Sequence, residues 1–76
     1  METPKKVIQE AGELVEMYGD KFAYLGKWKD GRDVFVFEMP ENEKTGFPFV
    51  YLYDKNELVM EVTGFDALDI IASFEE

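Results

Sequence analysis

Carboxylates are the side chains with which this chain could do chemistry, because it contains neither histidine nor cysteine. Two short segments bring them together, Glu-Asn-Glu at residues 41–43 and Asp-Lys-Asn-Glu at residues 54–57. Neither segment has the spaced oxygen ligands of a calcium-binding loop. A catalytic carboxylate pair also needs a cleft that raises the pKa of one partner, and the sequence indicates none. We interpret both segments as solvated turns and predict no catalytic residue, metal or cofactor.

The missing residue types exclude several classes of protein. Without cysteine there is no disulfide, thiolate zinc site or thiol nucleophile. Without histidine the commonest general base is absent. Seventeen acidic and eight basic residues give a formal net charge of −9, which disfavours a phosphate-binding surface. The sequence therefore predicts an acidic protein that is not an enzyme and does not bind nucleic acid. The alternative, an enzyme, would have to use carboxylates, tyrosine or lysine.

Length and composition predict one folded domain over residues 1–76. The chain is 46% hydrophobic and 16% aromatic, unlike disordered acidic chains. No apolar run approaches the ~20 residues of a membrane-spanning helix. The first residues lead into an amphipathic pattern rather than a signal peptide. We expect a cytoplasmic protein without a membrane partner.

The elements that must position any functional side chain begin and end with helices. Residues 4–18 are predicted to form a helix, with Pro4 at its first position and Gly19 at its end. A second helix is predicted over residues 64–74. Their apolar positions recur at helical spacing: Val7, Ile8, Ala11, Leu14, Val15 and Tyr18 in the first, and Ala67, Leu68, Ile70, Ile71 and Phe74 in the second.

Two β-hairpins are predicted between the helices, joined by a polar connection at residues 40–47. In the first, Asp30-Gly31 suits a two-residue type I′ turn, which places Trp28 opposite Asp33. In the second, Lys55-Asn56 is either a two-residue turn or part of a longer loop.

With two-residue turns, the strands give the sheet an aromatic face and an aliphatic face. The aromatic face holds Phe22, Tyr24, Trp28, Phe35, Phe37, Met39, Phe49, Tyr51, Tyr53, Leu58, Met60 and Val62. The aliphatic face holds Ala23, Leu25, Val34, Val36, Val50, Leu52 and Val59. We expect both helices to cover the bulkier aromatic face. The predicted fold is an α+β two-layer sandwich, helix–four strands–helix, with a mainly antiparallel sheet.

The uncovered aliphatic face is the first candidate for function. An apolar patch of this size favours contact with a partner, and a homodimer is the simplest one. The candidate interface residues are Leu25, Val34, Val36, Val50, Leu52 and Val59. The alternative is a half-solvated sheet, with Lys27, Glu38 and Glu61 at its rim. Reversed helix placement would instead expose the aromatic residues.

A second hypothesis is a small-molecule binding module with an aromatic-lined pocket, for which Tyr24, Trp28 and Tyr51 are candidate anchors of a ligand or partner. Basic residues gather around the first hairpin, where they could orient a charged partner or solvate a sheet edge. These are Lys21, Lys27, Lys29 and Arg32.

Residues 46–74 resemble the C-terminal strand–strand–helix part of thioredoxin-like proteins. The resemblance rests on Gly46-Phe47-Pro48 before a strand, a polar turn, and Gly64 before the last helix. It implies that Pro48 corresponds to the cis-proline of that family. The chain has no Cys-x-x-Cys motif, so the resemblance implies a remnant without redox activity. The whole chain also resembles short uncharacterised bacterial proteins that carry a domain of unknown function.

Overall fold

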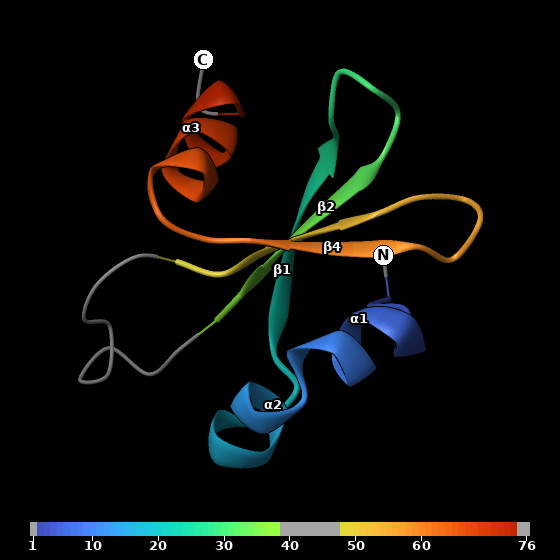
Figure 1. The fold of residues 1–76 in the computed structure, drawn as a ribbon, viewed down its shortest axis with the longest axis vertical. Helices are drawn as coiled ribbons and strands as arrows, with labels where there is room; N and C mark the ends of the chain where they lie inside the picture. Colours follow the sequence, from blue (N-terminus) through green and yellow to red (C-terminus); the bar gives the residue numbers. More distant parts are fainter. Residues whose placement is uncertain (1, 39–47, 75–76) are drawn as a thin grey trace.

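A four-stranded antiparallel sheet forms the centre of the molecule, with strand order β1-β2-β3-β4 (Figure 1). The computed structural model describes residues 2–38 and 48–74. The strands are β1 (Phe22–Lys27), β2 (Asp33–Phe37), β3 (Val50–Tyr53) and β4 (Val59–Val62). β1 and β4 are therefore the two edges of the described sheet. The predicted acidic turn at 41–43 and Met39 lie outside the described residues.

The first hairpin closes through a three-residue loop, not the predicted two-residue turn. The Trp28 N–H donates to the Arg32 carbonyl (2.8 Å), and the Gly31 N–H donates to the Trp28 carbonyl (2.8 Å). Gly31 has φ +87°, which fits a type I turn followed by a left-handed residue. Asp-Gly suits this loop as well as a type I′ turn, so the dipeptide alone did not determine the register.

A bulge at Leu25 shifts the register of the same hairpin again. Tyr24 pairs with Phe35, but Gly26 pairs with Val34. One inserted residue moves the side chains that follow to the other face. Trp28 consequently packs on the face opposite Tyr24, and its predicted place on the aromatic face is wrong.

The second hairpin repeats the three-residue loop, in agreement with the longer-loop alternative. The Asp54 N–H donates to the Leu58 carbonyl, and the Glu57 N–H donates to the Asp54 carbonyl, both at 3.0 Å. Val59 therefore pairs with Tyr53, and Met60 with Leu52. The predicted faces of β4 are exchanged: Val59 lies with the aromatic residues, whereas Met60 and Val62 do not.

Three helices pack on the sheet: α1 (Lys5–Ala11), α2 (Glu13–Tyr18) and α3 (Phe65–Ser73). The first two replace the single helix predicted over residues 4–18. Gly12 separates them with φ +44° and ψ −103°, a conformation that helical residues do not adopt.

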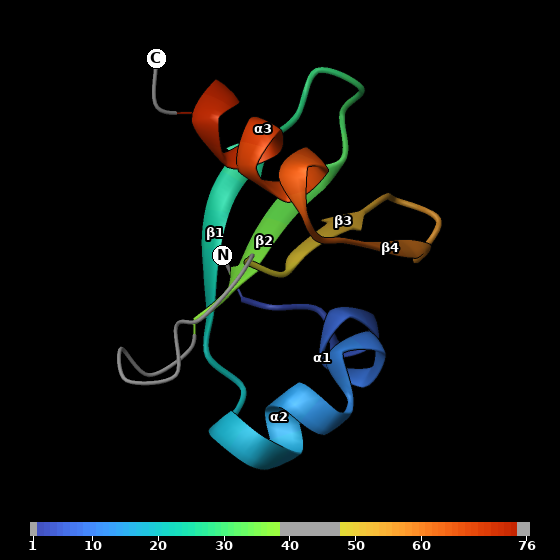
Figure 2. The ribbon, with the colours of Figure 1, turned by 60° about the vertical axis from the view of Figure 1, so that its left-hand side comes forward.

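The helices cover opposite faces of the sheet, α1 and α2 on one and α3 on the other (Figures 1 and 2). The α+β fold with an antiparallel sheet is confirmed. The predicted two-layer arrangement with both helices on one face is wrong, because helices on both faces make three layers. Both faces carry apolar side chains, and each gains from leaving water. Val7 and Ala11 pack with Phe35, Phe37 and Tyr51 on one side. On the other, Ala67 and Ile70 of α3 pack with Val34, Val50 and Leu52.

Candidate interaction surface

The predicted apolar interface lies inside the molecule. Val34 and Val50 are fully buried and Leu52 is 2% exposed, all beneath α3. Leu25 and Val36 pack against the same cluster, and Val59 packs on the other side of the sheet. These six side chains therefore do not form one free surface while α3 is in place.

The three predicted anchors are not brought together either. Tyr51 is fully buried, and its hydroxyl donates to Glu61 Oε2 (2.8 Å). Burial, with the neighbouring Glu61 carboxylate, raises the pKa of Tyr51. Tyr24 is partly exposed and donates to Asp33 Oδ1 (2.8 Å), and this hydrogen bond raises the pKa of Tyr24. Trp28 lies on the far side of the sheet from both.

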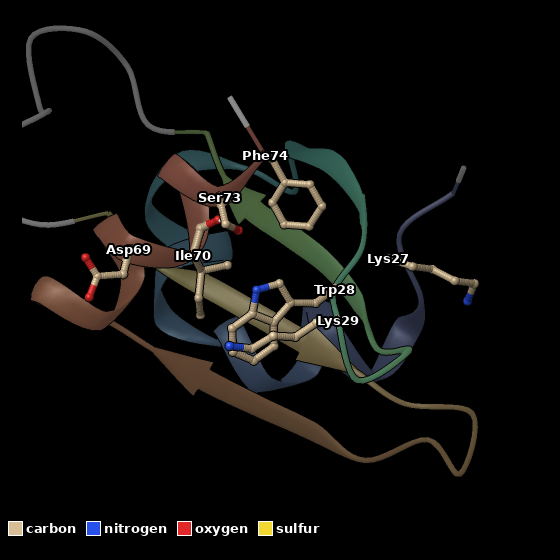
Figure 3. A pocket seen from close by; sticks show the side chains of 7 residues that line it. All are labelled: Lys27, Trp28, Lys29, Asp69, Ile70, Ser73 and Phe74. Carbon is tan, nitrogen blue, oxygen red and sulfur yellow. The ribbon is translucent and has the colours of Figure 1, made fainter. Parts of the chain in front are cut away.

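Trp28 lies between two shallow hollows beside α3. One, of about 450 Å³, is bounded by the indole, Ile70, Ser73 and Phe74. Figure 3 shows the indole near Ile70 and Phe74, with the Lys29 side chain beside the ring. The loop and the bulge together placed Trp28 here, so sequence periodicity could not have found this surface.

The other hollow, of about 420 Å³, extends from Trp28 to β4. Its apolar lining includes Leu52, Met60 and Val62, and Lys29 and Asp69 also line it. The hollow thus combines apolar side chains with charged side chains of both signs, since Arg32 and Asp66 line it as well.

Two cations hold the loop around Trp28. Lys29 Nζ lies 5.0 Å from the indole centroid, and Arg32 Cζ lies 5.9 Å from it. Arg32 also forms an ion pair with Asp30, which lowers the pKa of Asp30. Its Nη1 lies 4.0 Å from Met60 Sδ. Arg32 therefore connects the first hairpin loop to β4.

The outer edge of β4 is the most exposed apolar part of the sheet. We use "the β4 edge" for residues 58–62. Leu58 is 65% exposed and Met60 is 52% exposed. The β1 edge, by contrast, has a bulge and Lys27 within it, two features that discourage strand addition. Sequence reasoning missed the β4 edge because it placed Leu58 and Met60 in the helix-covered aromatic face.

A third hollow, of about 510 Å³, lies between the two hairpin loops and is polar. Lys27, Arg32 and Lys55 line it together with aspartates. Lys27 Nζ lies 3.2 Å from Asp33 Oδ1. In residues 2–38 and 48–74, no group of three acidic side chains could hold a metal ion.

Comparisons with protein-family models, with curated proteins and with solved structures found no match to this chain. The thioredoxin-like resemblance of residues 46–74 therefore stays a prediction. The peptide bond before Pro48 begins at Phe47, outside the described residues. None of the described helices is long and apolar enough to span a membrane.

Proposed function

We propose that this chain is a non-enzymatic protein-interaction module that works as a homodimer. The observation that carries the proposal is the β4 edge, where a sheet edge without a bulge or a lysine exposes Leu58 and Met60. An edge strand offers unpaired backbone donors and acceptors to another strand. The exposed apolar side chains add a hydrophobic contribution to such a contact.

The edge takes the place of the sheet face that the sequence suggested. Val34, Val50 and Leu52 already pack against α3, so their burial contributes to folding rather than to association. The β4 edge adjoins the hollow between Trp28 and β4 through Met60, and Arg32 lies against both Trp28 and Met60. A small domain with a limited core gains stability from such association.

Sedimentation equilibrium tests the homodimer. We expect a mass near twice the 8.8 kDa of the chain. The variant Met60→Glu should sediment as a folded monomer, because it places a charge in the contact. Met17→Glu is the matched control, since Met17 is 66% exposed and lies on α2. A wild-type chain that remains monomeric at about millimolar concentration would overturn the proposal, because such weak binding is worth only ~4 kcal/mol.

A second candidate function is binding of a small apolar molecule at Trp28. The half-buried indole with a hollow on each side supports it. Trp28 is the single tryptophan, so its fluorescence and its indole N–H resonance report on this site alone. An apolar ligand library should shift both signals. No response across the library would contradict this function.

A further inference from the structure

We propose that β4 pairs antiparallel with β4 of a second copy, with Met60 opposite Met60 at the two-fold axis. The inference rests on the proposed homodimer and specifies its contact. It follows from the hydrogen-bonding parity of β4, from the side chains on each of its faces, and from the position of Glu61.

Alternate residues of β4 direct their backbone N–H and C=O groups either toward β3 or toward the open edge, and we call this alternation the parity of the strand. The Asp54 N–H donates to the Leu58 carbonyl, so Asp54 and Leu58 are a hydrogen-bonded pair of the β3–β4 ladder. Hydrogen-bonded and non-hydrogen-bonded pairs alternate along antiparallel strands. Met60 is therefore bonded inward to Leu52, and the backbone groups of Val59 and Glu61 point to the open edge. These two residues are the ones whose donors and acceptors a new strand can pair.

Symmetry limits the possible registers. Two identical antiparallel strands are related by a two-fold axis normal to the sheet, so each side of the sheet stays continuous across the contact. Backbone parity is satisfied by an axis through any residue of β4. We consider the axes through Met60 and Glu61, because these are the two middle residues of Val59–Val62 and pair the largest part of the strand. Both keep the α3 side of one copy next to the α3 side of the other.

Charge selects between the two registers. Centred on Glu61, the contact sets two carboxylates directly opposite each other, which is destabilising. Centred on Met60, it sets Glu61 opposite Val59 of the second copy, and Leu58 opposite Val62. The α3 side of β4 then forms an apolar row from Leu58, Met60 and Val62 of both copies.

The Glu61 carboxylate has a partner within its own chain. It accepts the hydrogen bond from Tyr51 on the α1 and α2 side of the sheet (2.8 Å). Glu61 therefore needs no counter-charge from the second copy in the Met60-centred register. This fit of the strand to itself is why we assign the edge to a second copy rather than to a strand of another protein.

Single cysteine variants measure the register, since the chain has no cysteine of its own. In the proposed contact the two Met60 Cα atoms form a non-hydrogen-bonded pair about 4.5 Å apart, within disulfide range. The two Glu61 Cα atoms would be about 8 Å apart, and the two Leu58 Cα atoms about 14 Å apart. Under mild oxidation, Met60→Cys should form covalent dimers about tenfold faster than Leu58→Cys or Glu61→Cys, because pairing raises its effective concentration.

Leu58→Cys is the matched control, because Leu58 is at least as exposed as Met60 and collides as readily in solution. All three positions are exposed, and circular dichroism verifies the fold of each variant. A Met60→Cys rate no higher than that of Leu58→Cys would overturn the register. Glu61→Cys is a secondary comparison, because it removes the carboxylate that selects the register. Equal rates for all three variants, with a dimeric wild type in sedimentation, would overturn β4 pairing while the homodimer stands. A monomeric wild type with no fast cross-link would overturn both proposals. Cross-linking of Met60→Cys that is about tenfold faster than that of the other two variants supports both the homodimer and the Met60-centred contact.

Discussion

Glu57 is the only non-glycine residue with positive φ among those the structure describes, at φ 63°. It holds the position in the second hairpin loop that Gly31 holds in the first. A side chain in the left-handed region costs roughly 1–2 kcal/mol. Asp54 Oδ1 supports the strained loop by accepting from the Asn56 N–H (2.7 Å).

Replacement of Glu57 by glycine should therefore stabilise the fold. We expect Glu57→Gly to raise the free energy of unfolding by about 0.5 kcal/mol. The substitution removes the cost of a side chain in the left-handed region, but glycine loses more backbone entropy on folding, which offsets part of the gain. Urea denaturation followed by Trp28 fluorescence measures it. Gly31→Ala, at φ +87°, is the converse control and should destabilise. A loss of stability in Glu57→Gly would mean that its side chain has a role that the loop geometry does not explain.

Tyr51 predicts how stability depends on alkaline pH. Its pKa is raised from the ordinary 10.0 by burial and by Glu61, so the folded state keeps its proton where the unfolded state loses it. The stabilisation is complete below pH 10 and is lost as the pH rises from 10 toward the folded-state pKa, by at most about 1.4 kcal/mol per pH unit. The pKa of Tyr24 is also raised and acts in the same direction. Unfolding in urea from pH 8 to 11 should show a smaller decline for Tyr51→Phe. Equal declines would contradict this assignment.

At the scale of elements, the positions of the hairpins and of the last helix could be predicted, but the faces of the strands could not. Hydrophobic periodicity placed the hairpins around Asp30-Gly31 and Lys55-Asn56. The first loop has one residue more than the predicted turn, the second matches the longer of the two alternatives, and Leu25 forms a bulge that no residue type indicates. Because a strand alternates faces at every residue, these single-residue differences relocated Trp28 and exchanged the two sides of β4. The candidate surface depended on both.

A substitution at Gly12 distinguishes one continuous helix over the first helical segment from two helices that break at this residue. In a continuous helix, Gly12→Ala would stabilise by about 1 kcal/mol. In this structure φ is +44° at the break, so alanine should instead destabilise by roughly 1–2 kcal/mol. The sign of the change in thermal or urea denaturation decides between them. A stabilised variant would show that α1 and α2 are one helix.

At the scale of the whole molecule, charge opposes the proposed dimer. Each copy has a formal net charge of −9, and the proposed contact contains no ion pair between copies. Repulsion between two such copies weakens association at low salt. Screening by salt therefore strengthens the proposed dimer. An interface held by opposite charges would instead be weakened by salt.

Added salt should tighten the dimer. Raising the ionic strength from about 0.01 M to about 1 M shortens the Debye length from roughly 30 Å to roughly 3 Å and screens the repulsion. Sedimentation across this range should show a falling dissociation constant. Dissociation by salt would instead indicate a contact between the basic first hairpin loop and an acidic surface, and would contradict the β4 contact.

The position of α3 has a consequence for how the protein is made. The helix follows β4 along the chain, so all four strands are synthesised before the element that covers Val34, Val50 and Leu52. Until α3 docks, a nascent chain exposes this aliphatic side of the sheet to its neighbours, and such transient surfaces promote aggregation. The same side is bared if a protease removes α3. The apolar sheet face that the sequence suggested as an interface is thus exposed in a nascent or proteolysed chain. A cell would have to shield or degrade such a chain.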